Sequence, residues 1–358
     1  MSTGKVRVLV VDDSALVREI LSRGLAADPG IEVVGTASDP YVARDKIVQL
    51  RPDVLTLDVE MPKMDGVEFL RKLMPQYPLP VLMVSALTQR GKQITFEAME
   101  AGAVDFVTKP STDVARGLST MIRELREKVK AVSRADVSHW KRAKGQPAPQ
   151  KKAARPISSM ALAESTDKVI AIGASTGGTE AIRKVIRNLP GDTPGVVIVQ
   201  HMPAGFTKMF AERLNEQSAM EVREAQSGDR VMTGRVLIAP GDFHMELRRS
   251  GGIYQVNCSG GEKVCGHRPS VEVLFRSVAK YAAGNAIGVM LTGMGADGAD
   301  GMLAMREAGA RTMAQDEASS VVFGMPKEAY ARGGAEKLVP LDHIADELMR
   351  LLRAKSVS

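Results

Sequence analysis

Short apolar runs recur along this chain, and helix-length stretches of mixed polarity separate them. In the first third of the chain the runs are Val6–Val11, Ile31–Ala37, Val54–Leu57, Val81–Val84 and Val104–Val107. Runs that are apolar on both faces are typical of parallel strands, because helices cover both sides of such a sheet. The pattern predicts a flavodoxin-like, doubly wound domain with a five-stranded parallel sheet over residues 1–126.

The same alternation returns in the second half of the chain. Apolar runs lie at Val169–Gly173, Val196–Gln200 and Ala286–Leu291. The 358 residues exceed what one domain usually takes, so two domains are expected. We predict that residues 166–352 form a second doubly wound, mostly parallel α/β domain.

Residues 127–165, between the two predicted domains, are expected to form a basic, flexible linker. The segment from Arg126 to Ser165 holds ten Lys or Arg and three acids, a net charge of +7, whereas the rest of the chain carries −1. Its centre is rich in Lys, Ala and Pro, reading KRAKGQPAPQKKAAR from Lys141. Because the charge is confined to this segment, we expect a solvated tether without nucleic-acid contact. A DNA-binding output remains the alternative use of such a segment.

Targeting signals and structural cysteines are not evident. No apolar run approaches the roughly 18 residues that span a bilayer, and Asp12 and Asp13 interrupt the first run too early for a secretion signal. Cys258 and Cys265 are too few for a disulfide framework or a four-ligand zinc site. We therefore expect a cytoplasmic protein with no direct membrane insertion.

Polar residues follow the predicted strands of the first domain. Asp12 and Asp13 follow the first strand, Asp58 the third, Ser85 the fourth and Lys109 the fifth. The carboxyl ends of parallel strands meet at one edge of the sheet, where ligands bind. Three carboxylates gathered there repel one another unless a cation joins them, and hard oxygen ligands suit Mg²⁺.

The stretches VLVVDDSALVR, LTLDVEMPKMDGVEFL, VLMVSALT and AVDFVTKP resemble the receiver domain of response regulators. The resemblance implies that Asp58 accepts a phosphoryl group from a histidine kinase of the chemotaxis type. It also implies that Lys109 pairs with the phosphoryl oxygens and that Ser85 moves in to hydrogen-bond them. The implied Mg²⁺ ligands are Asp12, Asp13, Asp58 and the backbone carbonyl of Glu60. A cis peptide bond before Pro110 is implied as well.

In the second domain, three strand ends supply the components of a Ser-His-Asp relay. Ser175 follows the first of these runs, His201 the second, and Asp297 lies in a glycine-rich turn after the third. Ser175 stands in a G-x-S-x-G turn that exposes a serine between a strand and a helix. The same turn could instead cradle a phosphate at the helix N-terminus. The order Ser, His, Asp also differs from that of ordinary α/β-hydrolases.

Six motifs in this half resemble the catalytic domain of chemotaxis protein-glutamate methylesterases, the CheB family. They read IGASTGGTEAI, VIVQHMPAGFT, IAPGDFHMEL, HRPSVEVLF, LTGMGADGADGM and AQDEASSVVFGMPKEA. The resemblance implies a phosphorylation-activated serine hydrolase that demethylates glutamyl methyl esters on methyl-accepting chemoreceptors and also deamidates specific glutamines. Ester hydrolysis of this kind is expected to need no cofactor.

Carried onto this sequence, the resemblance makes Ser175 the nucleophile, His201 the general base and then acid, and Asp297 the residue that orients the imidazole. The backbone N–H of Met294 would help form the oxyanion hole, with Thr176 close beside it. Glu272 stands where the family has Asp. His244 and His267 belong to family motifs, but no chemical role can be assigned to either from the sequence.

Overall fold

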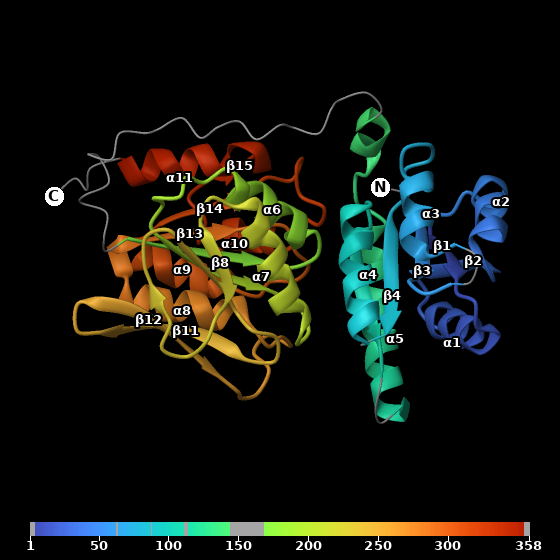
Figure 1. Ribbon diagram of the computed structural model, residues 1–358, viewed down its shortest axis with the longest axis horizontal. Coiled ribbons are helices and arrows are strands. Elements are labelled where there is room, and N and C mark those ends of the chain that lie inside the picture. The colour runs from blue at the N-terminus through green and yellow to red at the C-terminus, as the bar shows by residue number, and fades with distance from the viewer. Residues whose placement is uncertain (1–3, 62–63, 87, 111–113, 144–167, 354–358) are drawn as a thin grey trace. The chain divides into compact units, whose positions relative to one another are not determined.

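The computed structural model of the protein describes residues 4–61, 64–86, 88–110, 114–143 and 168–353. The chain divides into two compact units, Met1–Lys151 and Lys152–Ser358 (Figure 1). Each unit is an α/β fold with its own parallel sheet, as predicted.

The first unit is built around a five-stranded parallel sheet of order β2-β1-β3-β4-β5. In chain order its elements are β1 Val6–Val11, α1 Ala15–Ala26, β2 Ile31–Ala37, α2 Pro40–Leu50, β3 Val54–Asp58, α3 Gly66–Leu73, β4 Val81–Ala86, α4 Gln89–Glu100, β5 Asp105–Lys109, α5 Val114–Val132 and the 3-10 helix η1 Ser138–Ala143. Helix α1 contacts α5, while α3 contacts both α2 and α4. The doubly wound five-stranded fold is therefore confirmed.

Polar caps begin the first three helices at defined residues. The side chains of Ser14, Asp39 and Asp65 accept backbone N–H groups from the first turns of α1, α2 and α3. Each cap satisfies donors that have no partner within the helix, which typically stabilises it by about 1 kcal/mol. The loops from β1, β2 and β3 thus end at fixed points near the carboxyl edge of the sheet.

Helix α5 continues to Val132, past the predicted domain end at residue 126. Val129 and Val132 are fully buried. Lys128 pairs with Asp105, 3.2 Å away, and Lys130 pairs with Asp28 at 2.7 Å. These basic residues belong to the folded unit, so the prediction of a solvated linker is wrong for this stretch.

The folded chain extends beyond α5 through η1. Ala135 and Val137 lie between α5 and η1 in the sequence, and both are buried. A Cβ atom added to Gly102 would lie 3.0 Å from the Trp140 ring, so the indole packs closely against that glycine. The predicted linker therefore begins too early by the whole of residues 127–143. Its remainder, from residue 144 to 165, lies outside the described residues.

The second unit is larger and contains two sheets. Its elements are β6 Val169–Ala174, α6 Gly178–Arg187, β7 Gly195–Gln200, α7 Phe206–Gln217, β8 Glu221–Glu224, β9 Arg230–Val231, β10 Arg235–Ile238, β11 His244–Ser250, β12 Ile253–Ser259, α8 Val271–Tyr281, η3 Ala283–Asn285, β13 Ala286–Met290, α9 Ala299–Glu307, β14 Arg311–Gln315, α10 Met325–Ala331, β15 Leu338–Val339, η4 Leu341–His343 and α11 Ile344–Arg353. The main sheet has seven strands in the order β15-β14-β13-β6-β7-β10-β8, and all its pairings are parallel.

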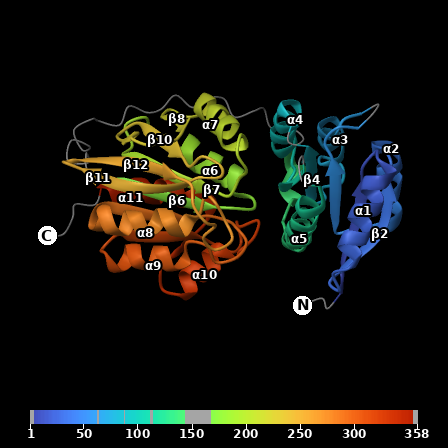
Figure 2. The same cartoon turned by 90° about the horizontal axis from the view of Figure 1, so that it is seen from below.

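Helices cover both faces of this sheet, with α6, α7 and α11 on one side and α8, α9 and α10 on the other (Figure 2). The second sheet is a small antiparallel one of order β11-β12-β9, and β11 packs against α8. The prediction of a doubly wound, mostly parallel domain is confirmed. Among the described helices, none is long and apolar enough to cross a membrane.

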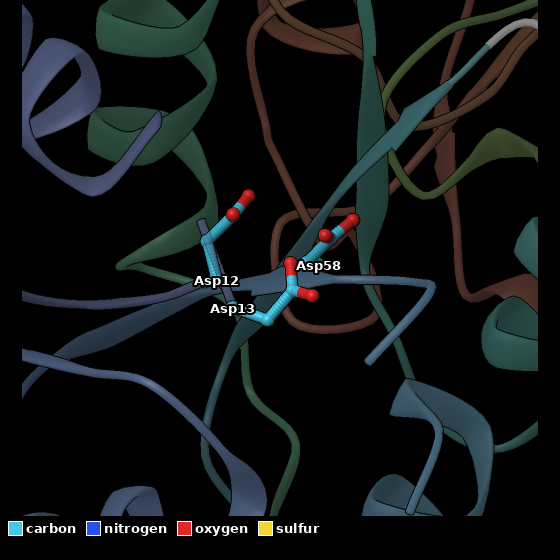
Figure 3. A group of neighbouring side chains, drawn as sticks. All are labelled: Asp12, Asp13 and Asp58. Carbon is cyan, nitrogen blue, oxygen red and sulfur yellow. The ribbon is translucent and has the colours of Figure 1, made fainter. Parts of the chain in front are cut away.

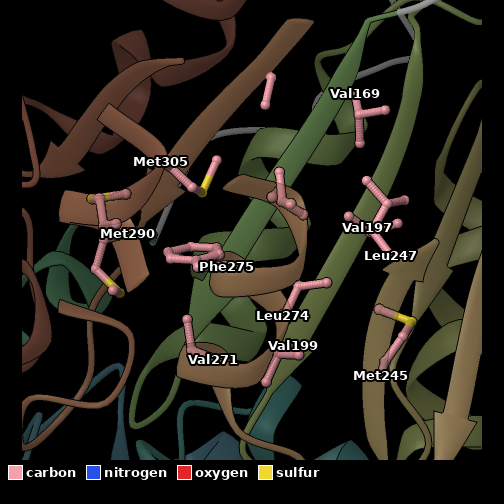
Figure 4. Packing of buried hydrophobic residues seen from close by; sticks show 14 of the residues in the cluster. Val169, Val197, Val199, Met245, Leu247, Val271, Leu274, Phe275, Met290 and Met305 are labelled. Carbon is pink, nitrogen blue, oxygen red and sulfur yellow. The ribbon is translucent and has the colours of Figure 1, made fainter. Parts of the chain in front are cut away.

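Helix α8 carries much of the core on its face of the sheet. Leu274 and Phe275 are fully buried among residues of β6 and β7, and the hairpin residues Met245 and Leu247 belong to the same cluster (Figure 4). Fully burying a side chain of this size contributes about 1.5–3 kcal/mol. The position of α8 is therefore strongly determined, and that position matters because its first turn contacts the candidate site.

A first prediction concerns the end of the first unit. A fragment of residues 1–126 should unfold at a lower urea concentration than a fragment of residues 1–143. The shorter fragment loses Val129 and Val132, and their burial contributes about 3 kcal/mol or more together. Equal midpoints for the two fragments would show that residues 127–143 add nothing to the folded unit.

Candidate active site and receiver site

Ser175 lies directly after β6, at the turn that leads into α6. Its backbone N–H donates to the Thr292 carbonyl at 3.0 Å, and its own carbonyl accepts the Gly178 N–H at 2.7 Å. The serine is thus held between the ends of neighbouring strands β6 and β13. The side chain is partly exposed, as a reactive hydroxyl requires.

His201 follows β7, the neighbour of β6 in the sheet, and joins the other two candidate residues. Its Nδ1 lies 3.1 Å from Ser175 Oγ, and its Nε2 lies 2.7 Å from Asp297 Oδ2. An ionised carboxylate can only accept, so Nε2 carries the ring proton and Nδ1 is free to accept the serine proton. The three residues that the sequence places on separate strands therefore form one connected relay.

Asp297 is buried and accepts four hydrogen bonds. Besides His201, its donors are the Ser270 hydroxyl at 2.7 Å and the backbone N–H groups of Val271, at 2.7 Å, and Glu272, at 3.1 Å. Burial alone would raise the pKa of Asp297, but the hydrogen bonds from His201, Ser270 and Val271 outweigh it and lower that pKa. The carboxylate consequently stays ionised opposite the imidazole.

Gln200 connects the backbones of the first two relay members. Its buried side-chain amide donates to the Ser175 carbonyl at 2.9 Å and to the His201 carbonyl at 3.2 Å. A Cβ atom at residue 178 would lie 2.1 Å from Gln200 Oε1, so only glycine fits there. The last glycine of the G-x-S-x-G-G turn is therefore required for packing.

The other two predicted site residues lie beside the relay. Thr176 is buried, and its carbonyl accepts a hydrogen bond from Thr292 Oγ1 at 3.0 Å. Met294 is partly exposed in the turn after β13, and its backbone N–H donates no hydrogen bond to any described residue. That N–H is consequently available to a ligand.

Glu272, where the resemblance implies Asp, is buried, and both of its carboxylate oxygens have partners. Its Oε2 accepts the Gly301 N–H of α9 at 2.8 Å, and its Oε1 pairs with Arg276 at 2.6 Å. The longer side chain therefore joins α8 to α9 and does not contact the relay through its carboxylate.

The second predicted site gathers three carboxylates at the ends of β1 and β3. Oxygen atoms of Asp12, Asp13 and Asp58 lie within 4.8 Å of one another (Figure 3). Asp12 and Asp58 are buried and Asp13 is exposed, which leaves one side open to water. Donors of this kind fit Mg²⁺, which prefers carboxylate oxygens and retains several waters.

Lys109, at the end of β5, lies between two of these carboxylates. Its Nζ is 2.9 Å from Asp12 Oδ2 and 3.0 Å from Asp58 Oδ2. Burial raises the pKa of Asp58 to about 6; Lys109 opposes this rise and Asp12 adds to it. Burial alone would lower the pKa of Lys109, but Asp58 and Asp12 outweigh it and raise that pKa.

The remaining predicted receiver features are Ser85, the Glu60 carbonyl and the cis bond before Pro110. The Ser85 hydroxyl is buried, lies 3.3 Å from the Gly91 carbonyl that it donates to, and accepts from Thr95 Oγ1 at 2.7 Å. Glu60 is exposed two residues after Asp58, and the metal-binding role of its carbonyl stays a prediction. The expected cis bond before Pro110 is wrong, since Arg268–Pro269 is the one cis peptide bond within the described residues.

Comparison with known proteins decides the family. The model of the response regulator receiver domain matches residues 8–122, and that of the CheB methylesterase matches residues 170–348. A protein-glutamate methylesterase/protein-glutamine glutaminase of Syntrophotalea carbinolica is 68% identical over 353 residues, 99% of this chain and 99% of that protein. This chain belongs to the CheB methylesterase family.

Further similarities agree. A CheB relative in Sulfurimonas denitrificans, also named a protein-glutamate methylesterase/protein-glutamine glutaminase, is 54% identical over 350 residues, 97% of this chain and 98% of that one. The crystal structure of the Thermotoga maritima CheB methylesterase catalytic domain is 39% identical with a TM-score of 0.50. It covers 51% of this chain and 98% of that domain.

Three residues around the relay were not anticipated from the sequence of this CheB chain. Ser270 and Gln200 act on the relay through hydrogen bonds, and His267 stacks on the His201 ring. A serine just before a helix is a common N-cap, and that signal was present at Ser270. Nothing local marks Gln200, because its partners are defined only by strand pairing.

A second prediction follows from the burial of Asp58. Because the pKa of Asp58 is raised to about 6 in the folded state, the folded chain binds a proton at Asp58 more tightly than the unfolded chain does. The stability of the fold therefore falls as pH rises from about 4 to 6. Asp58→Asn removes the buried charge. In metal-free buffer at pH 7 it should stabilise the 1–143 fragment by about 1–3 kcal/mol in urea unfolding.

The matched control is Asp45→Asn, which removes an exposed carboxylate from α2. This control should change stability little at either pH. At pH 4 the advantage of Asp58→Asn should shrink, since Asp58 is then protonated in the folded chain. An advantage that is equal at pH 4 and pH 7 would contradict the pKa given for Asp58.

Proposed function

We propose that this chain is a phosphorylation-activated serine hydrolase that demethylates glutamyl methyl esters on methyl-accepting chemoreceptors and also deamidates specific glutamines. The observation that carries the proposal is the Ser175–His201–Asp297 relay in a chain of the CheB family. Its place of action would be the cytoplasm, where the receptors present their methylated helices and a chemotaxis histidine kinase supplies phosphate.

The reaction begins at Ser175. His201 Nδ1 takes the hydroxyl proton as Oγ attacks the carbonyl carbon of the ester, and the Nε2–H to Asp297 stabilises the imidazolium. The backbone N–H of Met294 hydrogen-bonds the tetrahedral oxyanion. A donor of this kind typically contributes about 10²–10³ in rate.

When the tetrahedral species collapses, the bond between the carbonyl carbon and the methoxy oxygen breaks. The methoxy oxygen takes the proton held by His201 and leaves as methanol. Water then attacks the acyl-enzyme, with His201 again as base, and releases free glutamate and Ser175. Deamidation follows the same steps with ammonia as the leaving group. Thr176, next to the nucleophile, would line the site on the substrate side.

Phosphorylation would occur on Asp58 in the first unit. Asp12, Asp13, Asp58 and the Glu60 carbonyl would hold Mg²⁺, which supplies positive charge that offsets the charge on the phosphoryl group when it is bound. Lys109 already contacts Asp58 and would pair with a phosphoryl oxygen. Ser85 would leave its contact with Gly91 and hydrogen-bond the same group.

Control would act by direct contact between the units. We assign residues 1–143 to the receiver, 144–165 to a tether rich in Lys, Ala and Pro, and 166–352 to the catalytic domain. The unphosphorylated receiver would cover the crevice of Ser175, and each tenfold of activation requires only about 1.4 kcal/mol of difference in contact stability.

A third prediction tests the activity itself. Wild-type chain should release methanol from receptor membranes that carry methylated glutamates, and release should rise when Mg²⁺ and a small phosphodonor are added. Ser175→Ala should lose several orders of magnitude of this rate. If Ser175→Ala stayed within tenfold of wild type, Ser175 would not be the nucleophile. The G-x-S-x-G turn could then serve to bind phosphate.

The same assay tests the control mechanism. Asp58→Asn should stay at the unstimulated rate when the phosphodonor is added, and a fragment beginning at Asp167 should exceed the unphosphorylated full chain. A fragment no faster than that chain would exclude obstruction by the receiver. Phosphorylation would then have to improve the catalytic site itself.

A fourth prediction concerns the third relay member. An amide at residue 297 presents an N–H group where His201 Nε2 now donates, which favours the tautomer with the proton on Nδ1 and removes the acceptor for Ser175. Asp297→Asn should lower kcat by about 10²–10⁴-fold, less than Ser175→Ala. Asp300→Asn, an exposed acid on α9, is the matched control. Unchanged turnover in Asp297→Asn would remove this residue from the relay.

A further inference from the structure

His267 lies against the catalytic imidazole, although no step of the proposed reaction uses it. The rings of His267 and His201 are stacked, with centroids 3.7 Å apart and planes inclined by 10°. Both rings are partly shielded from solvent. A parallel contact at this distance is full van der Waals contact over one face of the catalytic ring.

The backbone of His267 is itself fixed. Its N–H donates to the Val264 carbonyl at 2.9 Å, and its carbonyl accepts the Val264 N–H at 3.1 Å. The reversal between these residues passes through Cys265 and Gly266, both at positive φ. Three residues further on, Ser270 begins the set of donors that hold Asp297. One short segment, Val264–Glu272, thus contacts two of the three relay members.

The hydrogen bonds of His201 leave one motion of its ring open. Both bonds, to Ser175 Oγ and to Asp297 Oδ2, lie at the ring edge and are made through its two nitrogens. They hold two edge atoms of the ring, so a rotation of the ring plane is opposed only by the bending of these two bonds. The torsion about the Cβ–Cγ bond, which turns the ring plane, is only weakly restrained in an isolated histidine, because it joins sp³ and sp² carbons.

We propose that His267 is a positioning residue for the hydrolysis, its ring holding His201 in the plane that joins Ser175 to Asp297. This inference rests on the proposed function. The planar face of residue 267 is therefore the property that matters, and a phenyl ring should replace it.

The test measures the reactivity of Ser175 in the full chain, with Mg²⁺ and phosphodonor present throughout. A fluorophosphonate probe reacts as Oγ forms the P–O bond, fluoride leaves and His201 takes the hydroxyl proton, so no receptor is needed. His267→Ala should slow this labelling by about 10–100-fold, the usual cost of a small misplacement of a catalytic group. His267→Phe should remain within about threefold of wild type.

Further variants separate positioning from packing. His267→Leu keeps the side-chain volume without the planar face and should be slow, with a thermal unfolding midpoint close to that of His267→Phe. His343→Ala, at an exposed histidine of η4, is the matched control and should label like wild type. This set of outcomes would support the assignment even if His267→Ala folded poorly.

Two results would overturn the inference alone. One is wild-type labelling by His267→Ala or His267→Leu, which would show that the stack is not needed. The other is a His267→Phe variant as slow as His267→Leu, which would show that a ring face is not what residue 267 supplies. A wild-type chain that the probe does not label at Ser175 would instead overturn the proposed function, and the inference with it.

Discussion

Both halves of this protein depend on one constraint, the common direction of the strands in a parallel sheet. All carboxyl ends meet at one edge, so side chains far apart in sequence become neighbours when they follow adjacent strands. In the second unit β13, β6 and β7 are adjacent, and Asp297, Ser175 and His201 follow them in that order. In the first unit Asp12 and Asp58 follow the adjacent strands β1 and β3, and the long side chain of Lys109 reaches both carboxylates from the end of β5.

The two sites use buried charge in opposite ways. Asp297 is surrounded by donors, which keeps it ionised despite its burial. Asp58 has too few, and its raised pKa reflects a charge that the folded chain accommodates poorly. The surroundings of Asp58 are also tightly packed, because a Cβ atom added to Gly66 would lie 2.6 Å from the Asp58 carbonyl. The surroundings of Asp297 thus stabilise its charge, whereas burial opposes the charge of Asp58.

The sequence was sufficient to predict the elements that a parallel sheet imposes. The strands Val6–Val11 and Ile31–Ala37 match the predicted runs to the residue, because both runs are rich in β-branched residues. The β11–β12 hairpin was overlooked, since one face of an antiparallel ribbon is solvated and its strands read as polar stretches. The predicted domain end at residue 126 is too early because Lys128 looks solvent-exposed in the sequence, where nothing marks Asp105 as its partner. The relay residues were found by position, whereas Ser270 and Gln200 depend on tertiary contacts that no local pattern records.

The Gln200 amide has a consequence for motion. Since one NH₂ group is bonded to the carbonyls of both Ser175 and His201, the ends of β6 and β7 cannot separate without breaking a buried hydrogen bond. This cross-link therefore opposes any opening of the seam between the two strands. Nucleophile and base are therefore tied to each other through their backbones as well as through their side chains, and a movement of one strand end is passed to the other.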